Sequence, residues 1–295
     1  MLCRPSMILQ RTIHLLGISL ATYGQVLTLP RTIALKIQPQ PTSISPRIRL
    51  FSSMSSTDNT DVNEHSDRTN HSKRTIRMLA LHGSEGNAEN FAQRLEPWQS
   101  AALDEHEISL EITTITAPVP KGRGFAWWSM PPFVRSYNAT TYEHFGESEQ
   151  LVLQQLEEKG PFDIVMGFSQ GAILSTSLLA LKTVAQQHAR LGFILVGGAW
   201  PNPYTQQLES LGTVSESSEN TTLFQNNPVL IVAGTEDTIN PLEQSVRVQK
   251  ALEAGGCPVT LLTFDGGHVV PREDAILNDI LQWIQEKVVV GSQGE

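Results

Sequence analysis

Residues 162–185 are FDIVMGFSQGAILSTSLLALKTVA, a short apolar run followed by the pentapeptide GFSQG (167–171) and then by small and apolar residues. A Gly-x-Ser-x-Gly pentapeptide alone is a weak signal, but a strand before it and a helix after it are the context that a nucleophile elbow requires. In so sharp a turn a Cβ at either glycine would collide with neighbouring backbone. The stretch therefore predicts a strand–turn–helix unit that presents Ser169. The alternative is a tight turn with an exposed serine.

The chain on both sides of this unit alternates apolar runs with helical patterns. Continuous aliphatic runs such as FDIVMGF and PVLIVAG are typical of strands buried on both faces. We expect a compact α/β fold with a mostly parallel, doubly wound sheet of about six strands and helices on both faces. The expected strands are 75–81, 108–115, 162–168, 192–197, 228–234 and 258–264, and the expected helices are 88–103, 146–159, 170–188, 241–254 and 273–289.

Two connections are too long to be ordinary turns. Residues 117–145 and 198–227 each span about thirty residues, whereas two to six is usual between a strand and a helix. Such loops are expected to form pocket walls or lids.

A serine hydroxyl is a weak nucleophile at neutral pH, so Ser169 needs a histidine base, and the base needs an orienting carboxylate. In this class of fold the acid and then the histidine follow the nucleophile along the chain. The downstream histidines are His188, in the polar stretch AQQHAR, and His268, in DGGHVVP directly after the last expected strand. The Gly-Gly pair allows the loop to bring His268 over Ser169, and a simple turn histidine is the alternative.

The best candidate for the carboxylate is Asp237, in the loop that follows the strand PVLIVAG. Its neighbour Glu236 and the later Asp265 are alternatives, and an N-capping role for the helix after Pro241 would also account for Asp237.

Acyl transfer also needs backbone donors for a tetrahedral oxyanion. One is expected to be the N–H of Gln170, and the other the N–H of Ser84 in the segment LHGSEGN after the first strand. His82 in that segment precedes the nucleophile, which favours a loop-bracing hydrogen bond, and Asn87 is expected to cap the next helix.

The segment GFAWW places two large rings in the loop before the elbow. We expect one of Trp127 and Trp128 to line a substrate pocket and the other to anchor the loop in the core. Lys121 and Arg123 nearby would either meet an anionic part of a substrate or remain solvated.

Charge divides the chain. The net charge is −9, yet residues 1–57 contain six basic and no acidic residues, which leaves −15 on residues 58–295. An acidic body without Lys/Arg clusters argues against nucleic-acid binding. The two cysteines, Cys3 and Cys257, exclude a disulfide framework or a cysteine-based zinc site in the body.

The first 57 residues are expected to be a targeting leader, 58–74 a disordered linker, and 75–295 the hydrolase domain. Arg49-Leu50-Phe51-Ser52 resembles the processing pattern of mitochondrial presequences, so import into a mitochondrion or plastid is the first expectation. Secretory entry through the uncharged stretch 12–30, and a cytoplasmic protein translated from Met54, are the alternatives. No stable membrane insertion is expected.

Taken in order, LALHGSEGNAENF, GFAWW, MGFSQGA, GTEDTINP and FDGGHVVP resemble the FSH family of serine hydrolases over about 75–289. The resemblance implies a compact α/β-hydrolase without the usual preceding antiparallel strands, with Ser169 as nucleophile, Asp237 as acid and His268 as base. It also implies a cytoplasmic and possibly nuclear location if translation starts downstream. Acyl-protein thioesterases and related carboxylesterases also carry GFSQG and are the nearest enzymatic alternative.

We therefore expect a serine-dependent esterase or thioesterase that acts on small-molecule substrates with medium to long acyl or alkyl chains. Neither a metal nor an organic cofactor is expected. A hydrolase-fold binding protein without turnover and a protein–protein adaptor are the alternatives from other classes.

The expected leader can be tested at the N-terminus of the native protein. If residues 1–57 are removed on organellar import, N-terminal sequencing of the native protein will find a terminus near Ser52. A mature protein that begins at Met1, or near residue 30, would contradict organellar processing.

Overall fold

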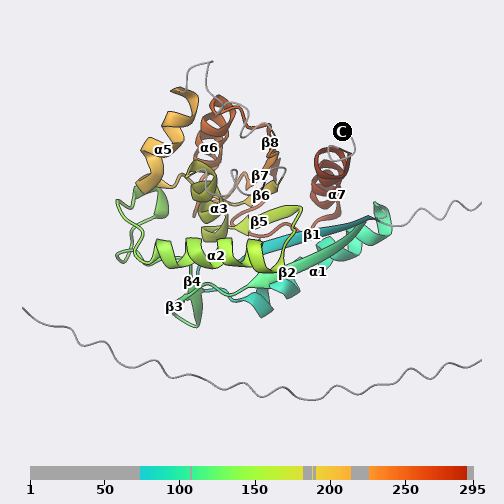
Figure 1. Ribbon diagram of the computed structural model, residues 1–295, viewed down its shortest axis with the longest axis horizontal. Helices are drawn as coiled ribbons and strands as arrows, with labels where there is room; N and C mark the ends of the chain where they lie inside the picture. Colours follow the sequence, from blue (N-terminus) through green and yellow to red (C-terminus); the bar gives the residue numbers. More distant parts are fainter. Residues whose placement is uncertain (1–73, 107, 182–187, 189–190, 214–225, 291–295) are drawn as a thin grey trace, which may run out of the picture. The chain divides into compact units, whose positions relative to one another are not determined.

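The computed structural model of the chain describes residues 74–290 except 107, 182–187, 189–190 and 214–225 (Figure 1). The expected leader and all of the expected linker except Arg74 lie outside the described residues. Most of the C-terminal part of the helix expected at 170–188 also lies outside them.

A six-stranded sheet forms the centre of the fold. Every neighbouring pair of strands is parallel, and the order across the sheet is β2-β1-β5-β6-β7-β8. The strands are β1 (Arg74–Leu81), β2 (Ile108–Ile115), β5 (Ile164–Phe168), β6 (Gly192–Val196), β7 (Val229–Gly234) and β8 (Val259–Phe264). The α/β fold with about six mostly parallel strands is thus confirmed.

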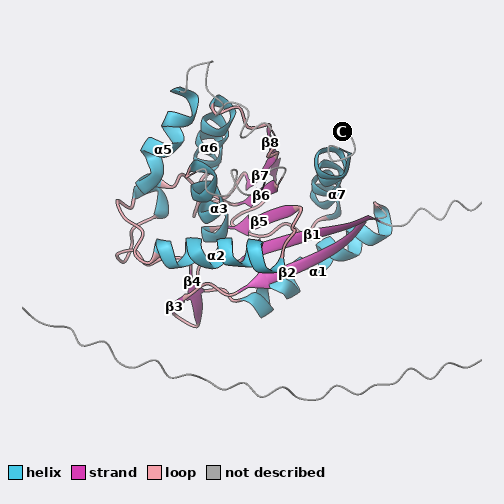
Figure 2. Ribbon diagram, viewed as in Figure 1, coloured by secondary structure: helices cyan, strands magenta, loops and turns pink. Residues whose placement is uncertain are grey.

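Helices cover both faces of this sheet (Figure 2). Helices α1 (Ala88–Glu105) and α7 (Asp274–Ile284) contribute side chains to one apolar cluster. Helices α2 (Phe145–Lys159), α3 (Gln170–Ala180) and α6 (Leu242–Ala254) contribute to the other. Helix α7 runs on into a π-helical segment at Gln285–Val290.

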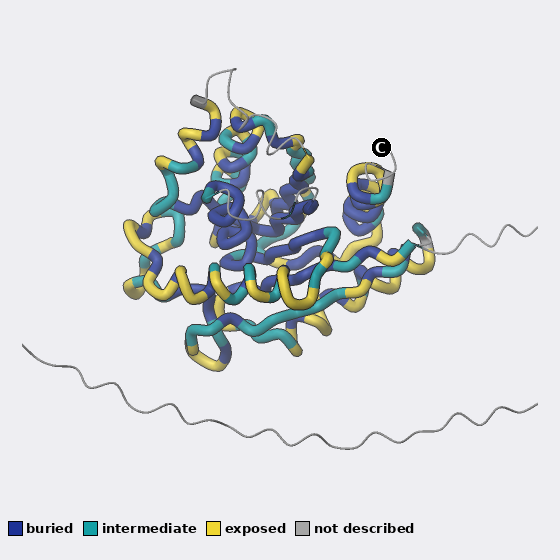
Figure 3. The backbone as a smooth tube through the Cα atoms, in the orientation of Figure 1, coloured by how far each residue is buried: buried dark blue, intermediate teal, exposed yellow. Residues whose placement is uncertain are grey.

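Side chains of the central strands alternate between the two clusters, as the pleat of a strand dictates. In β1, Met78 and Ala80 join the α1/α7 cluster, whereas Leu79 and Leu81 join the cluster on the opposite face. All five residues of β5 and of β6 are buried, which explains why their sequences are continuous apolar runs (Figure 3).

Helix α3, which follows the pentapeptide, is buried along its whole length. Its three consecutive hydroxyl residues, Ser175, Thr176 and Ser177, each donate a hydrogen bond to the carbonyl four residues earlier. Polar groups in the core are therefore satisfied within the helix itself, and a helix of small residues can pack closely against the sheet.

The two long connections contain more regular structure than the sequence predicts. The first holds an antiparallel hairpin, β3 (Val119–Lys121) with β4 (Gly124–Ala126), and a short helix, η1 (Ser136–Asn138). The second holds η2 (Asn202–Tyr204), α5 (Thr205–Ser210) and η3 (Leu211–Thr213). Three-residue strands are too short to show a period, but Gly122, at φ 59° in the hairpin turn, adopts the left-handed conformation that such turns need.

Candidate active site

Ser169 occupies a strained turn between β5 and α3. Its φ of 54° and ψ of −115° are unusual for a residue with a side chain. A Cβ on Gly167 would collide with the backbone of Gly171 and Ala172, and one on Gly171 would collide with the backbone of Leu81. Both flanking positions therefore require glycine, as the sequence predicts for an elbow.

The structure brings Ser169, His268 and Asp237 together in one hydrogen-bonded chain. His268 follows β8, and its Nε2 lies 2.7 Å from the Ser169 Oγ. Its Nδ1 lies 2.6 Å from the Oδ2 of Asp237, which follows β7. Parallel strands place their carboxyl ends at one edge of a sheet, so residues far apart in sequence meet there.

Asp237 is held as an acceptor. Its side chain is 1% exposed, and its Oδ1 accepts hydrogen bonds of 2.8 Å from the backbone N–H groups of Ile239 and Asn240. The other carboxylate oxygen is left for His268. With Asp237 accepting, His268 donates from Nδ1, and its Nε2 is free to accept the Ser169 hydroxyl proton.

The alternatives to these residues lie elsewhere. Glu236 is exposed, and the Asp265 carboxylate is in contact with the Thr235 hydroxyl at 3.4 Å. The backbone carbonyl of His188 accepts a hydrogen bond from Asn227, in the connection before β7.

A pocket of about 160 Å³ opens beside Ser169, and both expected oxyanion donors, Ser84 and Gln170, line it. The loop that carries Ser84 passes close to Ser169, since a Cβ on Gly83 would lie 3.2 Å from the Ser169 Cβ. Apolar side chains from the loop after β4, from α3 and from the loop after β7 complete the wall: Met130, Val134, Ile173 and Ile239. The expectation that residues 117–145 contribute a pocket wall is confirmed.

The model of the family described as Serine hydrolase (FSH1) matches residues 71–280. The chain belongs to this family. Membership supports an ester-hydrolysing enzyme, and the elbow and hydrogen-bonded triad are the arrangement that a serine hydrolase needs.

The relatives of this chain differ in length. A Schizosaccharomyces pombe protein named Dihydrofolate reductase is 30% identical over 161 residues, which are 52% of this chain but only 30% of that protein. Esterase OVCA2 of Xenopus tropicalis is 27% identical over 216 residues, which are 68% of this chain and 87% of that protein. The crystal structure of Zea mays acyl-protein thioesterase 2 has the same fold, with 20% identity, a TM-score of 0.54, and coverage of 74% of this chain and 96% of that one.

Trp127 and Trp128 are both fully buried, and neither is among the residues that line the pocket. The expectation that one of them lines substrate is wrong for this arrangement. The Trp127 indole N–H donates to the His82 carbonyl at 2.7 Å, and Trp128 stacks on Tyr142 with ring centroids 4.3 Å apart. Both rings anchor the loop, because their large apolar area is more stable in the core than at the rim.

The side chain of Gln170, a residue considered in the sequence only for its backbone, joins this loop to the elbow. Its Oε1 accepts a hydrogen bond from the backbone N–H of Trp127 at 2.9 Å, and its Nε2 donates to the backbone carbonyl of Trp128 at 3.0 Å. Gln170 is 3% exposed, so these bonds satisfy backbone groups that water does not reach. One amide thus positions the pocket wall relative to Ser169.

His82 braces the loop that carries Ser84. Its Nε2 accepts from the Ala117 N–H at 3.0 Å, which leaves Nδ1 to donate to the Gly83 carbonyl at 2.7 Å. Burial lowers the pKa of His82, which favours this neutral form. The predicted bracing role is confirmed. Asn87 caps α1 as expected, accepting from the Asn90 N–H at 2.9 Å.

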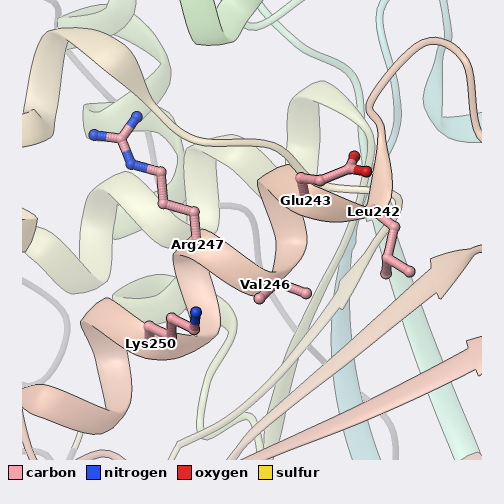
Figure 4. Close-up of a pocket in the computed structure, with 5 residues that line it drawn as sticks. All are labelled: Leu242, Glu243, Val246, Arg247 and Lys250. Carbon is pink, nitrogen blue, oxygen red and sulfur yellow. The ribbon is translucent and has the colours of Figure 1, made fainter.

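A second cavity, of about 420 Å³, lies along the exposed face of α6 and is lined by Leu242, Glu243, Val246, Arg247 and Lys250 (Figure 4). It contains none of the triad residues. The Arg247 guanidinium lies 3.7 Å from the centre of the Trp200 ring and 3.4 Å from the Glu209 carboxylate. These contacts make Arg247 part of the packing between α6 and the region of α5.

Among the described residues, no group of three or more His, Cys, Asp or Glu side chains is arranged to hold a metal ion. No helix in the same part of the chain combines the length and apolar character needed to cross a membrane.

The buried hydrogen bonds of the Gln170 side chain should contribute to the stability of the fold. Gln170→Met keeps the length of the side chain but leaves one buried N–H and one buried carbonyl without partners, at about 1–3 kcal/mol each. We expect urea denaturation to show a free energy of unfolding about 2–6 kcal/mol below that of the wild type. Gln154→Met, at an exposed position on α2, is the matched control and is expected to change it by less than about 0.5 kcal/mol. Equal stability of the two variants would contradict the bridging role.

Proposed function

We propose that this chain hydrolyses carboxylic esters or thioesters through an acyl-enzyme formed on Ser169. The observation that carries the proposal is the hydrogen-bonded chain from Ser169 through His268 to Asp237, with a serine backbone conformation typical of a nucleophile elbow. These contacts supply a nucleophile, a base and an orienting acceptor in contact with one another.

The first half of the reaction is acyl transfer to the enzyme. His268 takes the Ser169 proton as the oxygen attacks the substrate carbonyl, and the N–H groups of Ser84 and Gln170 stabilise the oxyanion. The imidazolium that results is stabilised by Asp237 and gives its proton to the leaving alcohol or thiol as the C–O or C–S bond breaks.

The second half is deacylation. Water enters where the leaving group departed, and His268 removes one of its protons during attack on the acyl-enzyme. The Ser169–acyl bond then breaks, His268 returns the proton to the serine oxygen, and the carboxylic acid leaves. The steps need no group beyond those of the chain and water.

The pocket supports acyl groups of medium to long chain. Its volume of about 160 Å³ holds about five water-sized groups, since one water takes about 30 Å³ of liquid volume. Longer chains would extend past the pocket, and Phe133, which directly precedes the pocket residue Val134, is fully exposed to solvent.

A series of p-nitrophenyl esters from acetate to palmitate tests this proposal. We expect kcat/KM to peak beyond butyrate, and Ser169→Ala to lower it about a thousandfold or more. Ser210→Ala, at an exposed position on α5, is the control and is expected to match the wild type. A peak at acetate or butyrate would contradict the chain-length assignment, and turnover that survives Ser169→Ala would contradict the mechanism. Absence of turnover by the folded wild type would favour a binding protein.

A further inference from the structure

Two cationic side chains line the pocket beside Ser169. Lys121 lies at the end of β3, and Arg135 immediately precedes η1. None of the residues that line the pocket is Asp or Glu. This is unusual within a hydrolase domain whose residues 75–295 carry a net charge of −14. The pocket is therefore a locally cationic site in an acidic domain.

Both cations are available to a ligand. Among the described residues neither forms an ion pair with a carboxylate, and Lys121 instead donates a hydrogen bond of 2.9 Å to the Ser84 hydroxyl. The carboxylate of Glu85 lies beside Gly122 in the hairpin turn. The neighbouring cation Arg123 is exposed but is not among the pocket residues.

The residues that line the pocket favour a place for the acyl group rather than for the leaving group. His268 must reach the leaving group to protonate it, so the leaving group has to sit beside the imidazole. His268 is not among the residues that line the pocket, whereas Ser84 and Gln170 are. We therefore expect the acyl group to occupy the pocket. A charged side chain on the pocket wall would then contact the acyl group and not the leaving alcohol or thiol.

We propose that the pocket selects acyl groups that carry a second carboxylate, so that half-esters or half-thioesters of dicarboxylic acids are the preferred medium-length substrates. Lys121 and Arg135 bind the distal carboxylate, while Met130, Val134 and Ile173 contact the methylene chain. The inference rests on the proposed hydrolysis at Ser169. One water is consumed, the ester or thioester bond breaks, and the products are the dicarboxylate and an alcohol or thiol.

A matched pair of substrates tests the inference. Mono-p-nitrophenyl adipate carries a free carboxylate, and p-nitrophenyl methyl adipate has the same chain with that charge removed. For the wild type we expect kcat/KM for the charged ester to exceed that for the neutral one by about fivefold, as two exposed ion pairs allow. The ratio should fall towards one at about 1 M salt, where screening is strong.

Variants of the two cationic residues show whether they cause the preference for the charged ester. The Lys121→Met/Arg135→Met double variant is expected to lower the charged-to-neutral ratio to about one, while Arg123→Met, the neighbouring cation outside the pocket, keeps the wild-type ratio. Circular dichroism checks that each variant folds, and Gln replacements substitute for any that does not. The wild-type ratio and its salt dependence test the inference without any variant.

Failure of this inference can be distinguished from failure of the proposed function. Ser169-dependent hydrolysis with a ratio near one in the wild type would overturn this inference and leave the proposed function standing. Loss of both activities, or turnover independent of Ser169, would overturn both. A preference for acyl-CoA over the same acyl group on N-acetylcysteamine that disappears in the double variant would place the anion on the leaving group and overturn the assignment to the acyl side.

Discussion

The rest of this structure depends on one steric constraint, the close approach of β5, α3 and β1 around Ser169. A side chain on Gly167 or Gly171 would collide with backbone, not with a movable side chain, so the turn cannot relax around a larger residue. This close approach holds Ser169 at a positive φ and projects its hydroxyl from the edge of the sheet. Burial of α3 along its whole length supplies the packing that maintains the strained turn.

Buried hydrogen bonds join this turn to the walls of the pocket. Gln170 follows Ser169 directly and forms hydrogen bonds with the backbone of both tryptophans, so the loop that supplies Met130 and Arg135 is positioned from the turn at Ser169. On the opposite side, His82 fixes the loop that carries Ser84. The pocket is thus assembled from four separate stretches of chain: the loop after β1, the hairpin with the loop after β4, the elbow with the start of α3, and the loop after β7.

The sheet and the elbow could be predicted because their signals are local. Buried parallel strands are continuous apolar runs, and the positions of Asp237 and His268 after strands follow from the topology of the sheet. The location of Trp127 and Trp128 could not be predicted, because a large ring suits a core and a pocket wall equally well. The bridging role of Gln170 and the approach of Arg135 to Ser169 left no local signal, since both depend on contacts more than thirty residues away.

The central claim is that Ser169 is a nucleophile activated by His268 within this chain of hydrogen bonds. Labelling with a fluorophosphonate probe, followed by mass spectrometry of the modified peptide, tests it most directly, because the reagent reacts with activated serines and needs no knowledge of the substrate. We expect stoichiometric modification of Ser169 in the wild type and labelling at least about a hundredfold slower in His268→Ala. An unlabelled folded wild type, or modification of another residue at the same rate in Ser169→Ala, would contradict it.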